Sequence, residues 1–354
     1  MSEPNKASIH LKKRRIAISM GILFLLGLIF FVLDIFLGSV HIPAGDILRI
    51  LTGEAAIKVE WKVIILDFRI PRTLTAVLVG AALSVSGLQM QTIFRNPLAG
   101  PYVLGISSGA SLGVAILVMG FTSLGFTAVL DNAGNWAMVI AATLGSGLIL
   151  MLILSVSVRI RDIMTILILG ILFGSIATAL VAVLQYFSTE SMLKSFIVWT
   201  MGSLGNVSSG QLRILSFTVL LGILISLASV KILNAMLLGE DYARTLGLDP
   251  KTVRMIIFIS TSMLAGTVTA FCGPVGFIGI VVPHIARLVF KTADHSVLLP
   301  GSLLIGAVFM LISDIFSKLP GYDQVLPINS VTALMGIPVI IWIIIRRKKI
   351  TSLS

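Results

Sequence analysis

Long apolar segments alternate with short polar ones along the whole chain. The first apolar segment begins directly after the basic run Lys12–Arg15, and nine others follow it. A helix needs about 20 apolar residues to cross a bilayer, so the shorter segments predict short, kinked or tilted spans. The ten segments are Ile16–Leu37, Leu74–Phe94, Tyr102–Leu124, Trp136–Val158, Ile163–Phe187, Leu212–Leu233, Val253–Phe271, Val275–Phe290, Val297–Phe316 and Ile328–Ile345. The pattern predicts an all-α integral membrane protein with about ten transmembrane helices.

The composition supports this fold class. Of the 354 residues, 57% are hydrophobic and only 12% are charged, whereas about 25% of the residues of a soluble domain are charged. We therefore expect a single membrane domain over residues 1–354. A cleaved signal peptide is the alternative for Ile16–Leu37. The segment is longer than a usual signal core and no small-x-small cleavage site follows it, so an uncleaved first span fits better.

The basic residues predict the orientation of the chain, because Lys and Arg accumulate on the cytoplasmic side of membrane proteins. With both termini inside, 18 of the 26 Lys and Arg residues fall on the inner side and 8 on the outer side. The formal net charge of +11 is thus concentrated at one membrane surface. Residues 1–15 then form a basic cytoplasmic tail, and residues 237–250 form a cytoplasmic loop.

The residues that carry most enzyme and metal chemistry are scarce. Cys272 is the single cysteine, which excludes an intrachain disulfide, and the four histidines do not have metal-ligand spacing. No GxxxxGK[ST] phosphate loop occurs. We expect no metal site, no cofactor, no catalytic site and no nucleic-acid partner. If the protein uses ATP, a partner must hydrolyse it.

Two similar Gly-Pro segments suggest an internal repeat. Gly100–Ile106 resembles Gly273–Ile280 with one insertion. The ten-span order places the first at the inner face and the second at the outer face, as an inverted repeat would. Chance similarity remains the alternative.

Arg69 and Arg72 are unusual because they are a basic pair on the outer side, separated by Pro71. Long basic side chains at helix ends commonly extend to lipid headgroups. Two guanidinium groups on a stiff backbone are also suited to binding the carboxylates of a partner. Both interpretations are open from these residues alone.

Two stretches carry a family resemblance. The sequences RIPR…GLQMQTIFRNPLAGPYVLGISSGASLG, beginning at Arg69, and GPVGFIGIVVPHIARL, beginning at Gly273, resemble the FecCD-type permeases of ABC importers for iron-siderophores, haem and cobalamin. The resemblance implies that Arg69 and Arg72 meet acidic residues of a substrate-binding protein. It matches a third docking arginine to Lys318, which keeps the charge but loses the bidentate fork. Asp314, four residues earlier, could pair with Lys318 instead.

The loop from Leu237 to Pro250 resembles the Glu-x-x-Ala-x-x-Leu-Gly coupling loop of ABC importers, which inserts into the ATPase subunit. A solvated loop is the alternative interpretation. The resemblance assigns ATPase coupling to a short helix that is bracketed by two glycines. The residues concerned are Gly239, Glu240, Ala243, Leu246 and Gly247.

The turn Asn96–Pro97–Leu98 is expected at the inner face, where it either simply ends the second span or lines the cytoplasmic mouth of the pore and helps to gate it. The resemblance implies a further constriction at Ile163 and Met164, at the start of the fifth span. His284 and Arg287 are expected at the inner end of the eighth span, in contact with headgroups or with the ATPase.

As a whole, the resemblance implies a multi-pass permease of the bacterial cytoplasmic membrane that imports a ferric siderophore. Its expected partners are two ATP-binding cassette subunits, an extracytoplasmic substrate-binding protein, a second permease copy or a paralogue, and membrane lipid. Haem or cobalamin is the alternative cargo. An ion-coupled secondary carrier is the alternative mechanism, although such carriers usually need ionisable groups deep in the membrane.

Overall fold

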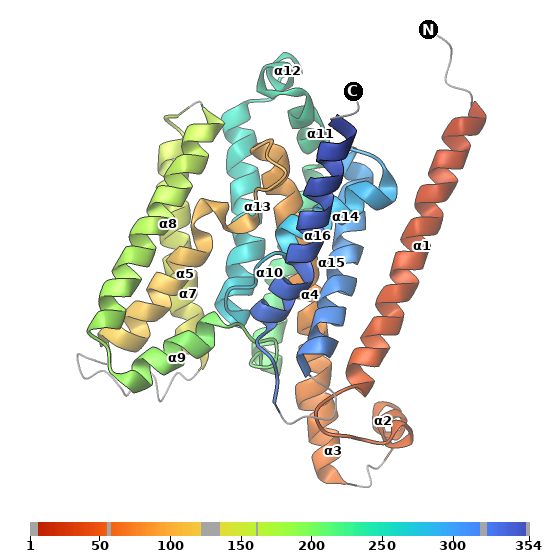
Figure 1. Ribbon diagram of the computed structural model, residues 1–354, viewed down its shortest axis with the longest axis vertical. Coiled ribbons are helices and arrows are strands. Elements are labelled where there is room, and N and C mark those ends of the chain that lie inside the picture. The colour runs from red at the N-terminus through yellow and green to blue at the C-terminus, as the bar shows by residue number, and fades with distance from the viewer. Residues whose placement is uncertain (1–5, 55–57, 122–134, 161, 319–323, 352–354) are drawn as a thin grey trace.

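The computed structural model describes residues 6–54, 58–121, 135–160, 162–318 and 324–351, and these residues form helices and connecting loops without any strand (Figure 1). The helices are α1 (Lys6–Phe36), α2 (Ala44–Leu51), α3 (Val59–Val63), η1 (Ile64–Arg69), α4 (Ile70–Ile93), η2 (Pro101–Leu104), α5 (Ile106–Ala115), η3 (Ile116–Phe121), α7 (Asn135–Ser157), α8 (Ile163–Tyr186), α9 (Glu190–Thr200), α10 (Ser209–Ala228), α11 (Val230–Leu238), α12 (Glu240–Thr245), α13 (Pro250–Cys272), α14 (Ile278–Phe290), α15 (His295–Lys318) and α16 (Ile328–Thr351).

The expected all-α membrane fold is confirmed. Within the described residues, seven helices are long and apolar enough to cross a membrane, and three shorter apolar helices occur at Ile106–Gly120, Ile278–Phe290 and Ile328–Ile343. Each of the ten predicted segments corresponds to one of these helices. The start of α1 and the end of α16 lie at the end of the molecule that carries α12, while α2, α3 and α9 lie at the opposite end (Figure 1).

The structure differs from the prediction in the second span, in the sixth span and in two additional helices. The second span begins at Val59, well before Leu74, because α3, η1 and α4 form one continuous 35-residue helical segment. The π-helical turns of η1 precede Pro71 and accommodate a residue that cannot donate a backbone hydrogen bond. The sixth predicted span is divided at Ser229 into α10 and α11. The short helices α2 and α9 lie outside the spans and were not predicted.

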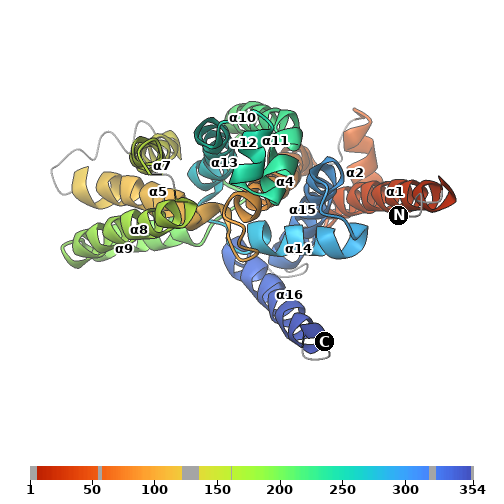
Figure 2. The same cartoon turned by 90° about the horizontal axis from the view of Figure 1, so that it is seen from above.

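Helix α4 lies at the centre of the helix bundle, between α15, α14, α13 and α10 (Figure 2). Every residue from Val79 to Phe94 is buried. A Cβ atom at Gly80 would collide with the carbonyl group of Gly306 in α15, and one at Gly87 would collide with Gly279 in α14. Small residues at these two crossings let the backbones touch, which drives helix association in a bilayer, where burial against lipid gives little gain.

The two Gly-Pro segments meet inside the protein, so their expected separation at opposite faces is wrong. The backbone N–H of Val275 donates to the Tyr102 hydroxyl oxygen at 3.4 Å. A Cβ atom at Gly279 would lie 2.5 Å from Cδ of Pro101. Helix α14 is short: its 13 residues span about 20 Å. The non-helical residues 273–277 precede it and contact η2 through Val275 and Tyr102.

The positions of α2 and α12 allow the orientation to be tested with two exposed residues, Thr52 and Asp241. We expect Thr52→Cys, in a Cys272→Ala background, to react with an impermeant thiol reagent added to intact cells. Asp241→Cys should react only after the membrane is opened, because Lys and Arg favour the inner side at its end of the bundle. Reaction of Asp241→Cys in intact cells would show that the chain has the opposite orientation.

Candidate functional site

Three basic residues line one cleft at the end of the protein opposite α12. The cleft has a volume of about 330 Å³ and lies between the chain after α1, the segment η1–α4 and the end of α15. Its lining includes Arg69, Arg72 and Lys318, together with Ser203 and Asn206 from the loop after α9. The structure therefore brings the three predicted docking residues together at one surface.

Arg69 lines this cleft with little exposure, because its guanidinium group is occupied inside the protein. The residue is 5% exposed. Its Nη1 atom donates to the carbonyl oxygens of Ile35 at 2.9 Å and Phe36 at 3.0 Å, and its Nη2 atom donates to the carbonyl of Val40. The last carbonyls of α1 lack helical partners, and Arg69 satisfies them. The expectation that this guanidinium faces outward is wrong, because the chain after α1 folds over it.

Arg72 and Lys318 belong to an outer ion cluster, defined here as Asp34, Arg72, Asp314 and Lys318. Arg72 forms a fork with Asp314, with its Nε and Nη2 atoms 2.9 Å and 2.7 Å from Oδ1. The Nζ atom of Lys318 lies 2.8 Å from Asp34 Oδ1 and 3.0 Å from Asp314 Oδ2. The Thr73 hydroxyl donates to Asp34 Oδ2 at 2.6 Å. The alternative pairing of Lys318 with Asp314 is confirmed.

The outer ion cluster balances two carboxylates against two cations and joins the outer ends of α1, α4 and α15. Neither carboxylate is exposed, and the side chain of Lys318 is only 5% exposed. The side chain of Arg72 is 17% exposed. Its Nη1 atom has no hydrogen-bond acceptor in the part of the chain that the structure describes. Within this cluster, Arg72 is therefore the cation best placed to bind a group in the cleft.

At the opposite end, α12 projects from the bundle (Figure 1). Gly239 (φ +122°) and Gly247 (φ +79°) turn the chain into and out of this short helix, with backbone conformations that favour glycine. Ala243 is buried against the protein, whereas Tyr242 is 48% exposed and Leu246 is 57% exposed. The predicted short helix is thus present, and two of its larger apolar side chains face away from the bundle.

The base of α12 is connected to three other parts of the bundle. The buried Arg254 of α13 has its Nη1 atom 3.8 Å from Glu240 Oε1, and its Nη2 atom donates to the Ile160 carbonyl before α8 at 3.4 Å. Arg95, after the end of α4, donates at 3.5 Å to the carbonyl of Met236 in the last turn of α11, which leads into α12 through Gly239. A displacement of α12 would therefore act on α13, on the start of α8 and on the end of α4.

The predicted gate turn follows α4 directly. The backbone N–H of Leu98 donates to Asn96 Oδ1 at 2.9 Å, which closes an Asx turn. Leu98 is half exposed, and the Pro97 carbonyl oxygen lies 2.8 Å from His284 Nε2. Arg287 donates to Gln91 Oε1 at 2.5 Å. Both basic side chains of α14 therefore contact the α4 region. Their contact with headgroups or the ATPase stays a prediction.

Ile163 and Met164 occupy the first turn of α8. Asp162 caps this helix by accepting hydrogen bonds from the backbone N–H groups of Met164 and Thr165. The hydroxyl of Thr165 and these N–H groups hold the pKa of Asp162 below its usual range. Met164 is 45% exposed and Ile163 is partly buried. Both residues thus lie close along the chain to Ile160, which contacts Arg254.

The interior between α4, α10 and α13 contains a neutral polar network. The Gln89 amide donates to the hydroxyl oxygens of Ser226 at 3.0 Å and Ser260 at 3.3 Å. The Thr261 hydroxyl donates to Gln89 Oε1 at 3.1 Å. These groups satisfy one another, and none of them carries a charge. The carboxylates buried within the described spans are Asp34 and Asp314, which both lie in the outer ion cluster.

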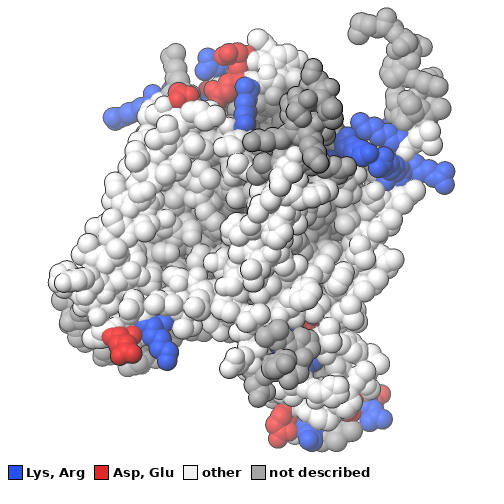
Figure 3. Space-filling model, in the orientation of Figure 1, with Lys and Arg blue, Asp and Glu red and all other residues white. Residues whose placement is uncertain are grey.

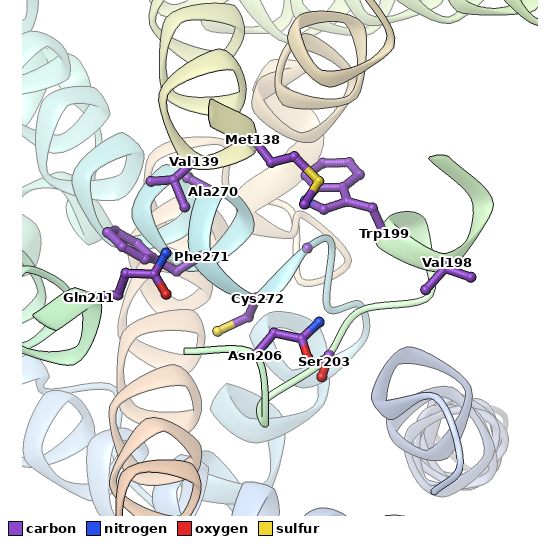
Figure 4. Close-up of a pocket in the computed structure, with 11 residues that line it drawn as sticks. Met138, Val139, Val198, Trp199, Ser203, Asn206, Gln211, Ala270, Phe271 and Cys272 are labelled. Carbon is purple, nitrogen blue, oxygen red and sulfur yellow. The ribbon is translucent and has the colours of Figure 1, made fainter. Parts of the chain in front are cut away.

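A small pocket lies near Cys272, between α7, α9, α10 and α13 (Figure 4). Its volume of about 40 Å³ corresponds to roughly one or two water molecules, so it is too small for an organic cargo. Cys272 is buried in its wall. Within the described residues, no group of three or more His, Cys, Asp or Glu side chains could hold a metal ion.

Comparison with known proteins decides the family. The family profile described as the FecCD transport family matches residues 25–346. The chain belongs to the FecCD transport family. It is therefore a permease subunit of an ABC importer, which is a transport component and not an enzyme. The resemblance seen in the sequence is confirmed.

Curated relatives and a solved structure extend this comparison. The vitamin B12 import system permease protein BtuC of Salmonella paratyphi A is 37% identical over 92% of this chain and 94% of its own length. BtuC of Shigella boydii serotype 18 is 37% identical over 88% of this chain and 94% of its own. A structure in an inward-facing conformation, assigned to the metal-chelate type of ABC transporter, superposes with a TM-score of 0.80. That structure is 29% identical and covers 92% of this chain and 98% of its own.

Proposed function

We propose that this chain forms the pore of a bacterial cytoplasmic-membrane importer that carries a preformed metal chelate. Two permease chains, either two copies of this one or this chain and a paralogue, enclose the pathway. Two ATP-binding cassette subunits bind at the end that carries α12, and an extracytoplasmic substrate-binding protein binds over the outer cleft. The mechanism is alternating access driven by ATP hydrolysis in the partner subunits.

The observation that carries this proposal is the arrangement of α12. The helix is held to the bundle by Ala243 and by the Glu240–Arg254 pair, while it presents Leu246 and Tyr242 outward. An exposed apolar helix face of this kind is suited to a groove on another protein. We infer that Gly239, Glu240, Ala243, Leu246 and Gly247 form the ATPase-coupling element.

The contacts at the base of α12 indicate which residues would form the gate. Arg95 and Arg254 link its base to the turn Asn96–Pro97–Leu98 and, through Ile160, to the chain before Ile163 and Met164. We infer that these residues line the inner mouth of the pathway and move together when the ATPase closes. His284 positions the turn through the Pro97 carbonyl.

An ion-coupled carrier is the less suitable alternative. Such a carrier needs an ionisable group that binds and releases its ion deep in the membrane. The buried carboxylates of the described spans are already neutralised by Arg72 and Lys318, and the network around Gln89 is neutral. The fold therefore fits an ATP-driven mechanism better.

At the outer surface, we expect Arg72 to contribute to docking more than Arg69. Arg72→Lys can keep an ion pair with Asp314, but a single ammonium group cannot also supply the second arm toward the cleft. We expect the substrate-binding protein to bind about tenfold to a hundredfold more weakly, as for a lost charge-assisted hydrogen bond. Fluorescence titration of the labelled binding protein onto the permease–ATPase complex in nanodiscs measures this change.

Arg69→Lys is the matched control. Its ammonium group can still donate to the carbonyls at the end of α1, so binding should change less than threefold. Equal weakening by both variants would support docking by both arginines, as the sequence suggested. Unchanged binding in Arg72→Lys would show that this cluster serves only the fold.

Two cargo classes have support. Cobalamin is favoured by the BtuC relatives at 37–38% identity. A ferric siderophore is the cargo that the sequence suggested, and it agrees with the metal-chelate assignment of the similar structure. Both are bulky metal–organic complexes that need a wide neutral pathway and no strong ligand from the protein.

A competition experiment tests the cargo. Cells that express this permease with its ATPase and binding protein would be given labelled cobalamin in the presence of excess ferric siderophore or haem, and then the reverse. We expect uptake of one chelate that the others do not inhibit. Absence of ATP-dependent uptake for all three would contradict the metal-chelate proposal.

A further inference from the structure

The inner end of α1 and the C-terminal end of α14 enclose a basic pocket that the transport proposal does not use. The pocket has a volume of about 210 Å³ and lies at the end of the bundle that carries the chain termini. Its lining is Lys12, Arg15, Ile16, Ser19, Val289, Phe290 and Lys291. Figure 3 shows basic side chains gathered at this end of α1.

The four α1 residues of this pocket recur at helical spacing. Lys12, Arg15, Ile16 and Ser19 occupy positions i, i+3, i+4 and i+7, and therefore share one face. This face turns toward the end of α14, which lies beside α1 (Figure 2). Cations form the part nearest the water, and the deeper part includes the apolar side chain of Ile16.

The three cations of the pocket are available to an anion. Lys12, Arg15 and Lys291 are exposed, and none of them forms an ion pair with a carboxylate in the described part of the chain. Asp294 is the nearest carboxylate along the chain to Lys291, but Asn234 and the Ser296 backbone N–H occupy it at 2.8 Å and 2.9 Å.

The backbone at Lys291 is also unusual. It adopts φ +48°, a left-handed conformation that is uncommon for residues other than glycine and asparagine. This conformation ends α14 and leaves the ammonium group at the pocket beside Val289 and Phe290. The site thus combines a cationic rim with an apolar wall.

We propose that this pocket binds an anionic phospholipid of the cytoplasmic leaflet, with the phosphate between Lys12, Arg15 and Lys291 and an acyl chain along Ile16, Val289 and Phe290. Basic pockets between transmembrane helices on the cytoplasmic side recognise such headgroups. A free phosphate ion would use only the cationic rim. The apolar wall and the position at the end of a membrane span favour a lipid.

A fluorescent label at the pocket tests this proposal. The full-length permease, with Ser19→Cys in a Cys272→Ala background, would carry a bimane group and be reconstituted with brominated phosphatidylglycerol or brominated phosphatidylcholine. We expect stronger quenching by phosphatidylglycerol. The same label at Ser155→Cys, an exposed position near the inner end of α7, should show no such preference.

Charge variants then locate the site. Lys12→Gln with Arg15→Gln and Lys291→Gln should weaken phosphatidylglycerol binding on the order of a hundredfold, since each cation that contacts the bound phosphate should contribute roughly a fivefold factor. The matched control is Lys13→Gln with Arg14→Gln and Arg159→Gln, which removes the same charge from exposed residues outside the pocket. The control should keep the preference for phosphatidylglycerol.

Three outcomes would overturn the proposal. The pocket variant could keep the preference, both triple variants could lose it equally, or inorganic phosphate could abolish it in the parent protein. The last result would indicate a site for free anions. If the pocket triple variant does not insert, Lys291→Gln alone, which leaves the N-terminal charges intact, should weaken binding roughly fivefold, and unchanged binding would refute the site.

Discussion

Leu246→Asp is expected to abolish ATP-driven uptake while the permease still inserts and folds. Leu246 is 57% exposed at the end of α12, so the substitution disturbs no internal packing. It would place a charge where the ATPase groove requires an apolar side chain, and burial of an unpaired charge at an interface is strongly unfavourable. Stimulation of ATP hydrolysis by the loaded binding protein should disappear together with uptake in proteoliposomes.

Val158→Asp is the matched control, since Val158 is a half-exposed apolar residue at the same end of the bundle but outside α12. It should retain most of the uptake. A second variant, Gly247→Pro, forces φ away from +79° and should also uncouple transport. If Leu246→Asp keeps both stimulation and uptake, α12 is a solvated loop and the ATP-driven assignment of this element is wrong.

Asp314→Ala is expected to have the largest effect on stability. Asp314 is fully buried and pairs with both Arg72 and Lys318. Its loss leaves the buried Lys318 and the partly exposed Arg72 with only Asp34, and breaking a buried ion pair in this way costs about 3–5 kcal/mol. Thermal unfolding of the purified permease in nanodiscs should show a clearly lower midpoint than that of the parent protein.

Two further variants show whether the loss of stability comes from the unbalanced cations. Asp67→Ala removes an exposed carboxylate of η1 at the same end of the protein and should change the free energy of unfolding by less than about 0.5 kcal/mol. Asp314→Ala combined with Lys318→Met restores charge balance between Asp34 and Arg72 and should recover part of the stability. An unchanged midpoint for Asp314→Ala would show that the outer ion cluster does not hold α1, α4 and α15 together.

The sequence by itself determined the helices that cross the membrane. Each span is encoded locally, because a helix in lipid satisfies its backbone within the segment and needs only enough consecutive apolar residues. The short helix α12 could also be predicted from the sequence, since Gly239 and Gly247 bracket a short polar stretch. The short helices α2 and α9 were missed because they lie outside the apolar runs that guided the prediction.

Only the tertiary structure decided which basic side chains are occupied by internal contacts and which remain available to a partner. Arg69 and Arg72 look equivalent in sequence, but the end of α1 supplies two carbonyl oxygens to Arg69, and the chain after α1 folds over it and adds the carbonyl of Val40. Lys318 is neutralised by Asp34, a residue from the opposite end of the chain. Burial and ion pairing depend on which distant segments come together, and apolar periodicity carries no information about that choice.

For the two Gly-Pro segments, too, the sequence predicted the local structure and only the tertiary structure decided the contact. Glycine and proline in the sequence correctly indicated interrupted helices, because both residues weaken or end a helix locally. Their contact through Tyr102 and Val275 could not be predicted, since it depends on how deeply η2 and the chain before α14 enter the bundle beside α4. The spans were thus set by local hydrophobicity, and the cleft, the outer ion cluster and the contacts around the turn Asn96–Pro97–Leu98 by long-range packing.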